Sequence, residues 1–168
     1  MSTDLTAPRW LDEEEQAAWR SYLRASRLLE VALDRDLLAH GVQLSEYEIM
    51  SMLSENPRRR LRMSEIATLV VQSRSRLTHT ASRLEKRGFV RREPCEGDRR
   101  GVELVLTDEG YAAVEAIAPL HVASVRAVLT DHLTRAQLLA MGAAMAAIAD
   151  GIEATGACEE VAEGVLPA

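Results

Sequence analysis

The sequence predicts a mainly α-helical fold with one small β-sheet, an α+β architecture, and two patterns carry this prediction. Apolar residues recur at three- and four-residue spacing through most of the 168 residues, as they do in amphipathic helices. Near the centre, residues 89–93 and 102–106 instead alternate as strands do, around a tip that contains Pro and Gly. With 47% hydrophobic residues, the chain suits one domain with a normal core, or one small domain with dimerisation arms.

The first predicted helix is long. It begins after Asp12, which forms a capping box with Glu15, and it runs to about His40, where Gly41 ends it. Its apolar residues occupy more than one flank. Because one small lobe cannot bury all of them, we expect this helix to have a further packing partner.

The second predicted helix begins at a capping box of Ser45 and Glu48, and Asn56-Pro57 ends it about ten residues later. An arginine-rich turn follows this helix. Residues 61–63 are then a candidate short strand, which would close the sheet of the central hairpin.

Two short helices come next, joined by about three residues. The first spans 63–71 and is predicted to be capped at Ser64; the second spans 73–87, between an N-cap at Ser73 and a stop at Gly88. The core face of the first helix comprises Ile66, Ala67, Val70 and Val71. This spacing is typical of a helix-turn-helix, in which the second helix enters a DNA groove and the first braces it.

The second of these helices has two different faces. Leu77, Ala81 and Leu84 form a narrow apolar stripe that can pack. The cationic and polar surface comprises Arg74, Arg76, His79, Arg83 and Lys86. Such a surface suits the major groove of DNA, although a solvated surface helix would have the same composition.

The hairpin over 89–106 corresponds in position to the wing of a winged helix-turn-helix. Its charged tip, P-C-E-G-D-R-R-G, contains Arg99 and Arg100. Both arginines sit where the tip could reach an adjacent minor groove, whose negative potential attracts Arg.

Two further helices are predicted after the hairpin. Thr107 caps the first, which runs to about Asp131 with a kink expected at Pro119. Thr134 and Gln137 form a capping box that opens the second, rich in Ala and Met. Small residues at helical spacing favour close helix approach, so this helix and the first predict a dimer interface, with packing within one chain as the alternative.

Charge is segregated along the chain. The net charge is −6, but residues 58–100 contain 13 Arg and Lys against 5 Asp and Glu, whereas the rest contains 7 against 21. A local cationic patch binds phosphate, and an acidic remainder discourages non-specific coating of DNA. Chance clustering of arginines on a solvated surface is the alternative.

Several other classes of protein are disfavoured. Cys95 and Cys158 form no disulfide or zinc pattern, and the four histidines lack metal-ligand spacing, so we expect no cofactor and no metal site. No catalytic motif is present, which predicts that the protein is not an enzyme. No signal peptide is evident, and no apolar run approaches the roughly 18 to 20 residues that span a bilayer, so we expect a cytoplasmic protein with no membrane partner.

A family resemblance brings these elements together. The run S-R-S-R-L-T-H-T-A-S-R-L-E-K-R-G-F-V-R-R, then D-R-R at 98–100 and L-T-D-E-G at 106–110, resembles the winged-helix signature of MarR-type transcriptional regulators. The resemblance extends from about Leu11 to about Ile152. We therefore expect a winged helix-turn-helix with long N- and C-terminal dimerisation helices.

The expected division of the chain follows from this resemblance. Residues 1–40 are the N-terminal dimerisation helix, and 44–106 are the DNA-binding lobe, with a recognition helix at 73–87 and a wing at 89–106. Residues 107–156 are the C-terminal dimerisation helices, and 157–168 are a mobile acidic tail.

Positions on the recognition helix suggest individual roles. Ser75, Arg76 and His79 are predicted to contact base edges of double-stranded DNA. The predicted phosphate contacts are Ser73, Thr78, Arg83 and Lys86, and Arg74 is a further predicted DNA-binding residue. Arg83 has an alternative role, in which it pairs with Glu85, Glu93 or Asp98 and holds the wing.

The resemblance also implies a role for the wing and for a second copy of the chain. The family's wing motif of Asp, any residue, Arg matches Asp98, Arg99 and Arg100, so Asp98 would orient the loop and Arg100 would enter the minor groove. A homodimer would place two recognition helices about 34 to 36 Å apart, on an inverted-repeat operator. Repression is the expected outcome.

Many relatives are released from DNA by small, often phenolic or anionic, ligands that bind between the arms and the lobe. The candidate pocket residues here are Trp10, Trp19, Tyr22, His40, Tyr47, Met50 and His121, with core packing as the alternative. Other relatives sense peroxides through a cysteine near the first helix, but no cysteine precedes Cys95. Near the wing tip, Cys95 would be either an oxidation-sensitive contact or an incidental exposed thiol.

Two other functions without catalysis are compatible with a winged helix-turn-helix. An architectural DNA-coating protein would bind all sequences alike, but its chain would usually be basic overall. A protein-interaction module on a winged-helix scaffold is disfavoured by the cationic segment.

Overall fold

The computed structural model describes residues 8–70, 73–95 and 97–155. The elements in chain order are α1 (Glu13–Leu38), α2 (Leu44–Glu55), β1 (Arg60–Arg62), α3 (Met63–Leu69), α4 (Arg74–Lys86), β2 (Val90–Cys95), β3 (Asp98–Leu106), α5 (Asp108–Val128), the 3₁₀ turn η1 (Thr130–His132) and α6 (Arg135–Glu153). This is the predicted mainly helical α+β fold.

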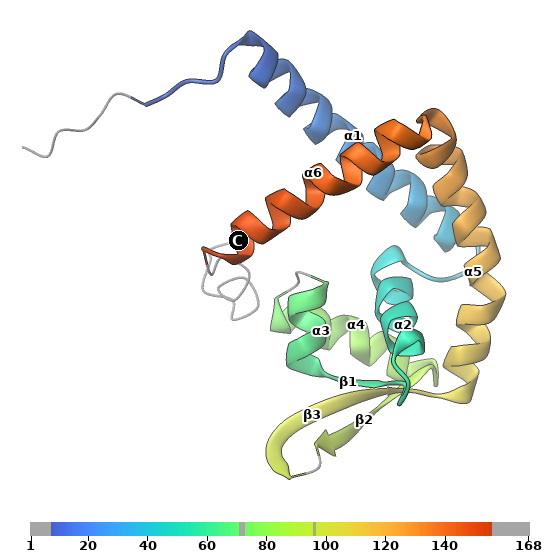
Figure 1. Ribbon diagram of the computed structural model, residues 1–168. Coiled ribbons are helices and arrows are strands. Elements are labelled where there is room, and N and C mark those ends of the chain that lie inside the picture. The colour runs from blue at the N-terminus through green and yellow to red at the C-terminus, as the bar shows by residue number, and fades with distance from the viewer. Residues whose placement is uncertain (1–7, 71–72, 96, 156–168) are drawn as a thin grey trace, which may run out of the picture.

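The molecule has a compact lobe and three long helical arms (Figure 1). The lobe comprises α2, α3, α4 and a three-stranded antiparallel sheet in the order β1-β3-β2. The arms are α1, α5 and α6, and α5 connects the end of the wing to the upper part of the molecule (Figure 1). The predicted strand before α3 therefore exists, and it pairs with β3 through Leu61 and Leu104.

The hydrophobic core lies inside the lobe. Side chains without solvent exposure come from every helix of the lobe and from its central strand: Ile49, Met50, Leu53, Ile66, Ala67, Leu77, Ala81, Leu84 and Leu104. Each fully buried leucine or isoleucine contributes about 1.5 to 3 kcal/mol relative to its exposed state. The core thus fixes α4 to α2, α3 and the sheet.

Four predicted helix starts are confirmed. Asp12 and Glu15 form the capping box of α1, and the side chains of Ser73, Thr107 and Thr134 each accept a backbone N–H in the first turn of α4, α5 and α6. Helix α5 continues through Pro119. Because an N-cap bond joins residues only two or three apart, the sequence alone contains the whole motif.

Two predicted starts were wrong. Helix α2 begins at Leu44 with Gln43, not Ser45, as its N-cap, because the Leu44 N–H donates to Asp34 Oδ1 (2.8 Å) and the Gln43 N–H donates to Glu46 Oε2 (3.1 Å). Ser64 does not cap α3. That helix begins directly after β1, and the Arg62 N–H donates to Glu65 Oε2 (2.9 Å).

The wing also differs from its prediction. Strands β2 and β3 extend into the segment that was expected to be a loop, with an irregularity between Pro94 and Cys95 that accommodates a proline in the ladder. The side chain of Cys95 is buried rather than exposed, so it is not the expected exposed thiol. A Cβ added to Gly101 would lie 2.7 Å from Cys95 Sγ, which shows how closely β3 covers that thiol.

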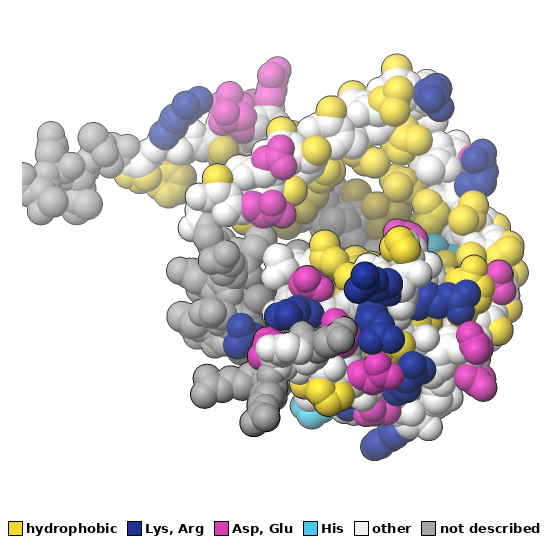
Figure 2. Space-filling model, turned by 60° about the horizontal axis from the view of Figure 1, so that its bottom comes forward, with side chains coloured by type: hydrophobic (Ala, Val, Ile, Leu, Met, Phe, Trp, Pro, Cys, Tyr) yellow, Lys and Arg dark blue, Asp and Glu magenta, His cyan; other side chains and the backbone are white. Residues whose placement is uncertain are grey.

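The arms are largely uncovered. Helix α6 contains no buried residue, and α1 contains only Leu37, within the part of the chain that the structure describes. Figure 2 shows hydrophobic side chains along the arms and Lys and Arg side chains over the lobe. The segments Asp108–His132 and Arg135–Glu153 are long and apolar enough, by length and composition, to cross a membrane, so the prediction that no segment approaches this size was wrong. Exposed apolar helices of this kind need a covering surface.

Candidate nucleic-acid interface

Helix α4 presents one face to the core and one to solvent. Leu77, Ala81 and Leu84 are buried as predicted, and Thr80 is buried with them. Thr80 Oγ1 donates to the Arg76 carbonyl oxygen (3.2 Å), which satisfies the hydroxyl away from water. The helix ends at Lys86 with Arg87 as its C-cap, and Gly88, which follows, has a φ of +75° that glycine adopts without strain.

The three predicted base-contacting residues lie together on the exposed face. Ser75, Arg76 and His79 are exposed and line a shallow hollow of about 400 Å³. Its other wall is the start of α2, which contributes Gln43 and Ser45. The sequence prediction missed this contribution from α2, because Ser45 was assigned to a helix cap.

The other predicted contacts on α4 are distributed around this row. Arg74, Thr78 and Lys86 are exposed, and Ser73 is half-buried. Thr78 Oγ1 donates to the Arg74 carbonyl (2.7 Å), so the hydroxyl is partly engaged by its own helix. Lys86, in the last turn, lies nearly three turns beyond Arg76 along the helix.

Many cations of the basic segment bind carboxylates of the same chain. Among the described residues, ion pairs are made by Arg59, Arg60, Arg62, Arg83, Arg87, Arg91 and Arg92. Arg83 does not pair with Glu85, Glu93 or Asp98, the partners named for its alternative role; its Nε lies 3.0 Å from Glu46 Oε1. Carboxylates of the same chain compete with DNA phosphate for these arginines, so the effective positive charge of the basic segment is smaller than its 13 Arg and Lys suggest.

Arginines attach the wing to α4 and to the end of β1. Arg92 of β2 binds Glu85 and also donates to the Thr78 carbonyl (3.1 Å) and to Ser82 Oγ (3.0 Å). Arg62 binds Asp98 at 3.3 Å, which agrees with an orienting role for Asp98 in the wing. The backbone of Arg99 and Arg100 lies in β3, whereas their side chains are outside what the structure describes.

The candidate ligand residues do not converge on one pocket. Trp19 and Tyr22 stack on each other on α1, with ring centroids 5.8 Å apart, and both are exposed. Trp10 is exposed before α1, and Met50 is fully buried in the core of the lobe. Tyr47 and His121 contact each other, with ring centroids 4.6 Å apart.

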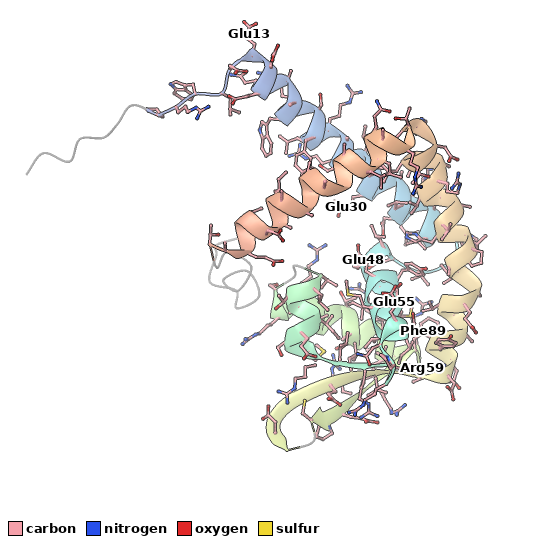
Figure 3. All side chains as sticks on the ribbon, in the orientation of Figure 1. Glu13, Glu30, Glu48, Glu55, Arg59 and Phe89 are labelled. Carbon is pink, nitrogen blue, oxygen red and sulfur yellow. The ribbon has the colours of Figure 1, made fainter. Side chains whose placement is uncertain are left out.

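Two hollows lie near the joint between the arms and the lobe. One, of about 400 Å³, is lined by His40, His121 and Ser124 among others. The larger, of about 860 Å³, lies between α1, α2 and Arg76 of α4, and Glu30 and Glu48 line it (Figure 3). Burial and the nearby Glu30 carboxylate raise the pKa of Glu48, and the Arg76 guanidinium partly opposes this rise.

His121 makes stability depend on pH. Burial lowers the pKa of its imidazole below the ordinary value of 6.5, and Nδ1 is buried without a hydrogen-bond partner among the described residues. As the pH falls, His121 of the unfolded chain therefore binds a proton before His121 of the folded chain does. The stability that neutral His121 contributes is complete above pH 6.5, and it is lost as the pH falls from there toward the lower pKa of the folded protein.

We expect the urea concentration at the midpoint of unfolding to decrease when the pH is lowered from about 8 to about 5.5. His121→Gln should remove part of that decrease. The exposed His132 provides the control, since His132→Gln should retain the full pH dependence. An unchanged pH profile in His121→Gln would contradict the assignment.

No group of three or more His, Cys, Asp or Glu side chains capable of holding a metal ion occurs within residues 8–70, 73–95 and 97–155.

Comparisons with known proteins agree on one family. A family model described as "MarR family" matches residues 40–101. The HTH-type transcriptional regulator PecS of Dickeya dadantii is 34% identical over 125 residues, which cover 71% of this chain and 73% of PecS. The transcriptional repressor MprA of Escherichia coli is 30% identical over 94 residues, 56% of this chain and 53% of MprA.

Solved structures extend the similarity to the arms. Sco3205, a MarR family transcriptional regulator from Streptomyces coelicolor solved in complex with DNA, is 47% identical with a TM-score of 0.83, covering 88% of this chain and 92% of that one. AbsC, a MarR family regulator from the same organism, is 44% identical with a TM-score of 0.82, covering 88% and 99%.

Proposed function

The chain belongs to the MarR family of transcriptional regulators, and from this premise we propose that it binds an inverted-repeat DNA operator as a homodimer and represses transcription. The observation that carries the proposal is the exposed row of Ser75, Arg76 and His79 on a helix held firmly by the core. Side chains of these types donate and accept hydrogen bonds at base edges in the major groove. The DNA complex of the similar Sco3205 supports the same assignment.

The arms form the dimer interface in this proposal. Large apolar side chains on α1, α5 and α6 are exposed, among them Val31 (68%), Val122 (57%) and Leu139 (59%). A second copy would cover them, which also accounts for the hydropathy of α5 and α6 without a membrane. We assign 1–40 and 107–156 to dimerisation and 44–106 to DNA binding; residues 157–168 lie outside the described part of the chain.

Repression and release by a ligand are the regulatory part of the proposal. Two curated relatives, MprA and YetL of Bacillus subtilis, are named as repressors. A small phenolic or anionic effector would bind near the joint of arms and lobe, where the two hollows lie. The effector must bind better to the conformer whose two recognition helices do not match the spacing of successive major grooves, since otherwise it does not change DNA affinity.

The relatives are transcriptional regulators rather than enzymes, and we assign this chain no catalytic activity. We also propose that it acts in the cytoplasm, where operator DNA lies in the bacteria that contain these relatives.

The proposal is tested by selecting duplexes from a random pool with the purified protein. We expect an inverted repeat whose half-sites lie about one helical turn apart, bound at least about a thousandfold more tightly than a scrambled duplex at matched salt. Equal affinity for both duplexes would instead indicate an architectural DNA-binding protein, and no binding to any duplex would contradict the proposal.

Arg100→Ala is expected to lower operator affinity without unfolding the protein. The variant removes a cation from the wing, where the minor groove of the operator attracts arginine. The measurement is a titration of operator at physiological salt, beside a thermal melt of the same preparation. Unchanged operator affinity would exclude Arg100 from the interface.

A further inference from the structure

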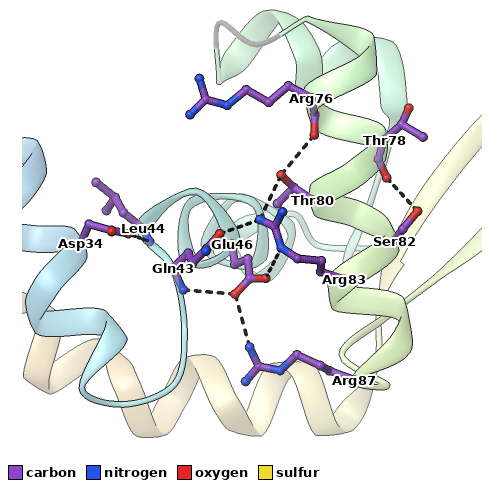
Figure 4. A network of polar contacts seen from close by, with 10 residues as sticks. All are labelled: Asp34, Gln43, Leu44, Glu46, Arg76, Thr78, Thr80, Ser82, Arg83 and Arg87. Atoms are coloured by element: carbon purple, nitrogen blue, oxygen red, sulfur yellow. Dashed lines mark hydrogen bonds and ion pairs between the residues drawn. The ribbon is translucent and has the colours of Figure 1, made fainter.

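Glu46, near the start of α2, is a buried carboxylate that binds Arg83 of the recognition helix and Arg87, the C-cap residue of that helix. Its side chain is 5% exposed; Oε1 lies 3.0 Å from Arg83 Nε, and Oε2 lies 3.3 Å from an Arg87 guanidinium nitrogen (Figure 4). Oε2 also accepts the Gln43 N–H that begins α2. Burying a carboxylate is costly unless it is paired and hydrogen-bonded, and these contacts supply that pairing.

Arg83 is held at more than one point. Besides Glu46, its guanidinium donates to Gln43 Oε1 (2.7 Å). Yet Arg83 also lines the hollow that contains Ser75, Arg76 and His79, and 44% of its side chain is exposed. Its guanidinium therefore lies beside the predicted DNA-reading row while its charge is bound to a carboxylate of the same chain.

Arg87 has a similar environment one turn further along. Its guanidinium lies over the ring of Phe89, 4.5 Å from the centroid, and 35% of its side chain is exposed. Both arginines are thus close enough to solvent to reach a DNA phosphate if the carboxylate did not bind them.

A cation that contacts phosphate strengthens binding to every sequence equally, since the backbone carries no sequence information. Withholding such a cation lowers affinity for random DNA and leaves base contacts in place. We propose that Glu46 keeps Arg83 and Arg87 off the DNA backbone and so limits the salt-dependent, sequence-independent part of the DNA affinity. This inference rests on the proposed function and assigns Glu46 a role that sequence reasoning missed, although the Gln43-x-x-Glu46 spacing of a capping box was visible.

The test is the salt dependence of binding to a random duplex, with Glu46→Gln compared with wild type. Glutamine keeps the size and the capping oxygen, because either Glu or Gln serves at this position of a capping box. Two released cations per subunit are expected to steepen the slope of log K against log [salt] by up to about 1.8. Glu46→Gln should therefore bind the random duplex more tightly than wild type at about 50 mM salt. On raising the salt to about 200 mM it should lose roughly tenfold more affinity per subunit than wild type loses.

Glu55→Gln is the matched control, since Glu55 is exposed at the other end of α2 and the charge change is identical. It is expected to leave the slope unchanged. Adding Arg83→Gln and Arg87→Gln to the Glu46→Gln variant is expected to return the slope to the wild-type value, which a merely structural role for Glu46 does not predict.

An unchanged or shallower slope in folded Glu46→Gln, while wild type still binds its operator, would overturn this inference alone. Failure of wild type to bind any duplex would overturn the proposed function as well. If Glu46→Gln does not fold, Arg87→Gln decides: an unchanged random-duplex slope supports the inference, and a slope reduced by about 0.9 per subunit means that Arg87 already contacts phosphate.

Discussion

Arg76→Ala is expected to lower operator affinity by at least about thirtyfold. A bidentate contact of arginine with a base edge is worth about 1 to 3 kcal/mol of discrimination, and a homodimer makes two such contacts, so the loss is about 2 to 6 kcal/mol. Arg76 is exposed in the N-terminal half of α4, and its side chain extends away from the Glu46 network (Figure 4). The measurement is a titration of the selected operator and of a scrambled duplex at the same salt.

Lys86→Ala provides the contrast for Arg76→Ala. Lys86 lies in the last turn of α4, where a phosphate contact is predicted. Its removal should weaken binding to all sequences alike and reduce the salt slope by about 0.9 per subunit. If Arg76→Ala weakens operator and scrambled duplex by the same factor, Arg76 contacts phosphate rather than a base.

Gly110→Ala is expected to destabilise the protein by roughly 2 to 4 kcal/mol, at or above the usual cost of overpacking. Gly110 lies in the first turn of α5, where its N–H donates to Thr107 Oγ1 (3.0 Å). A Cβ at this position would lie 2.1 Å from the Phe89 carbonyl oxygen and 2.8 Å from Leu106 Cδ1. That carbonyl cannot swing aside without loss, because it accepts the Thr107 N–H (3.0 Å).

Urea unfolding measures this effect, with Gly151→Ala as the control. Gly151 also lies in a helix, α6, but a Cβ there meets no atom within 4 Å. Its replacement should increase stability by about 0.5 to 1 kcal/mol, since alanine has less backbone freedom to lose on folding. Equal effects of the two replacements would show that the joint between wing and α5 can move to accommodate a methyl group.

The exposed face of the recognition helix shows how much local sequence patterns predict. Ser73 and Gly88 bound the recognition helix, and Leu77 and Leu84 define its buried face, so the exposed positions of Ser75, Arg76 and His79 followed from periodicity. Nothing beyond the order of residues along one helix was needed for this prediction.

Long-range partners were not predictable in this way. The candidate partners of Arg83 were carboxylates within fifteen residues of it, but the structure places Glu46, 37 residues away, against its guanidinium. Cys95 was expected in an exposed tip, and continued pairing of β2 with β3 buries it. For Arg83 a distant segment supplies the contact, whereas Cys95 is covered by the adjacent strand of its own hairpin.

The amino-acid order by itself determined the elements, the caps at Asp12, Ser73, Thr107 and Thr134, the wing and the family, because these depend on contacts between residues a few positions apart. Packing of segments against one another decided the start of α2 through Asp34, the burial of Cys95 in the hairpin, and the pairing of Arg83 with Glu46. The physical reason is that a charge or a hydrogen-bonding group takes the nearest partner in space, and spatial proximity across a core is not encoded in any local spacing.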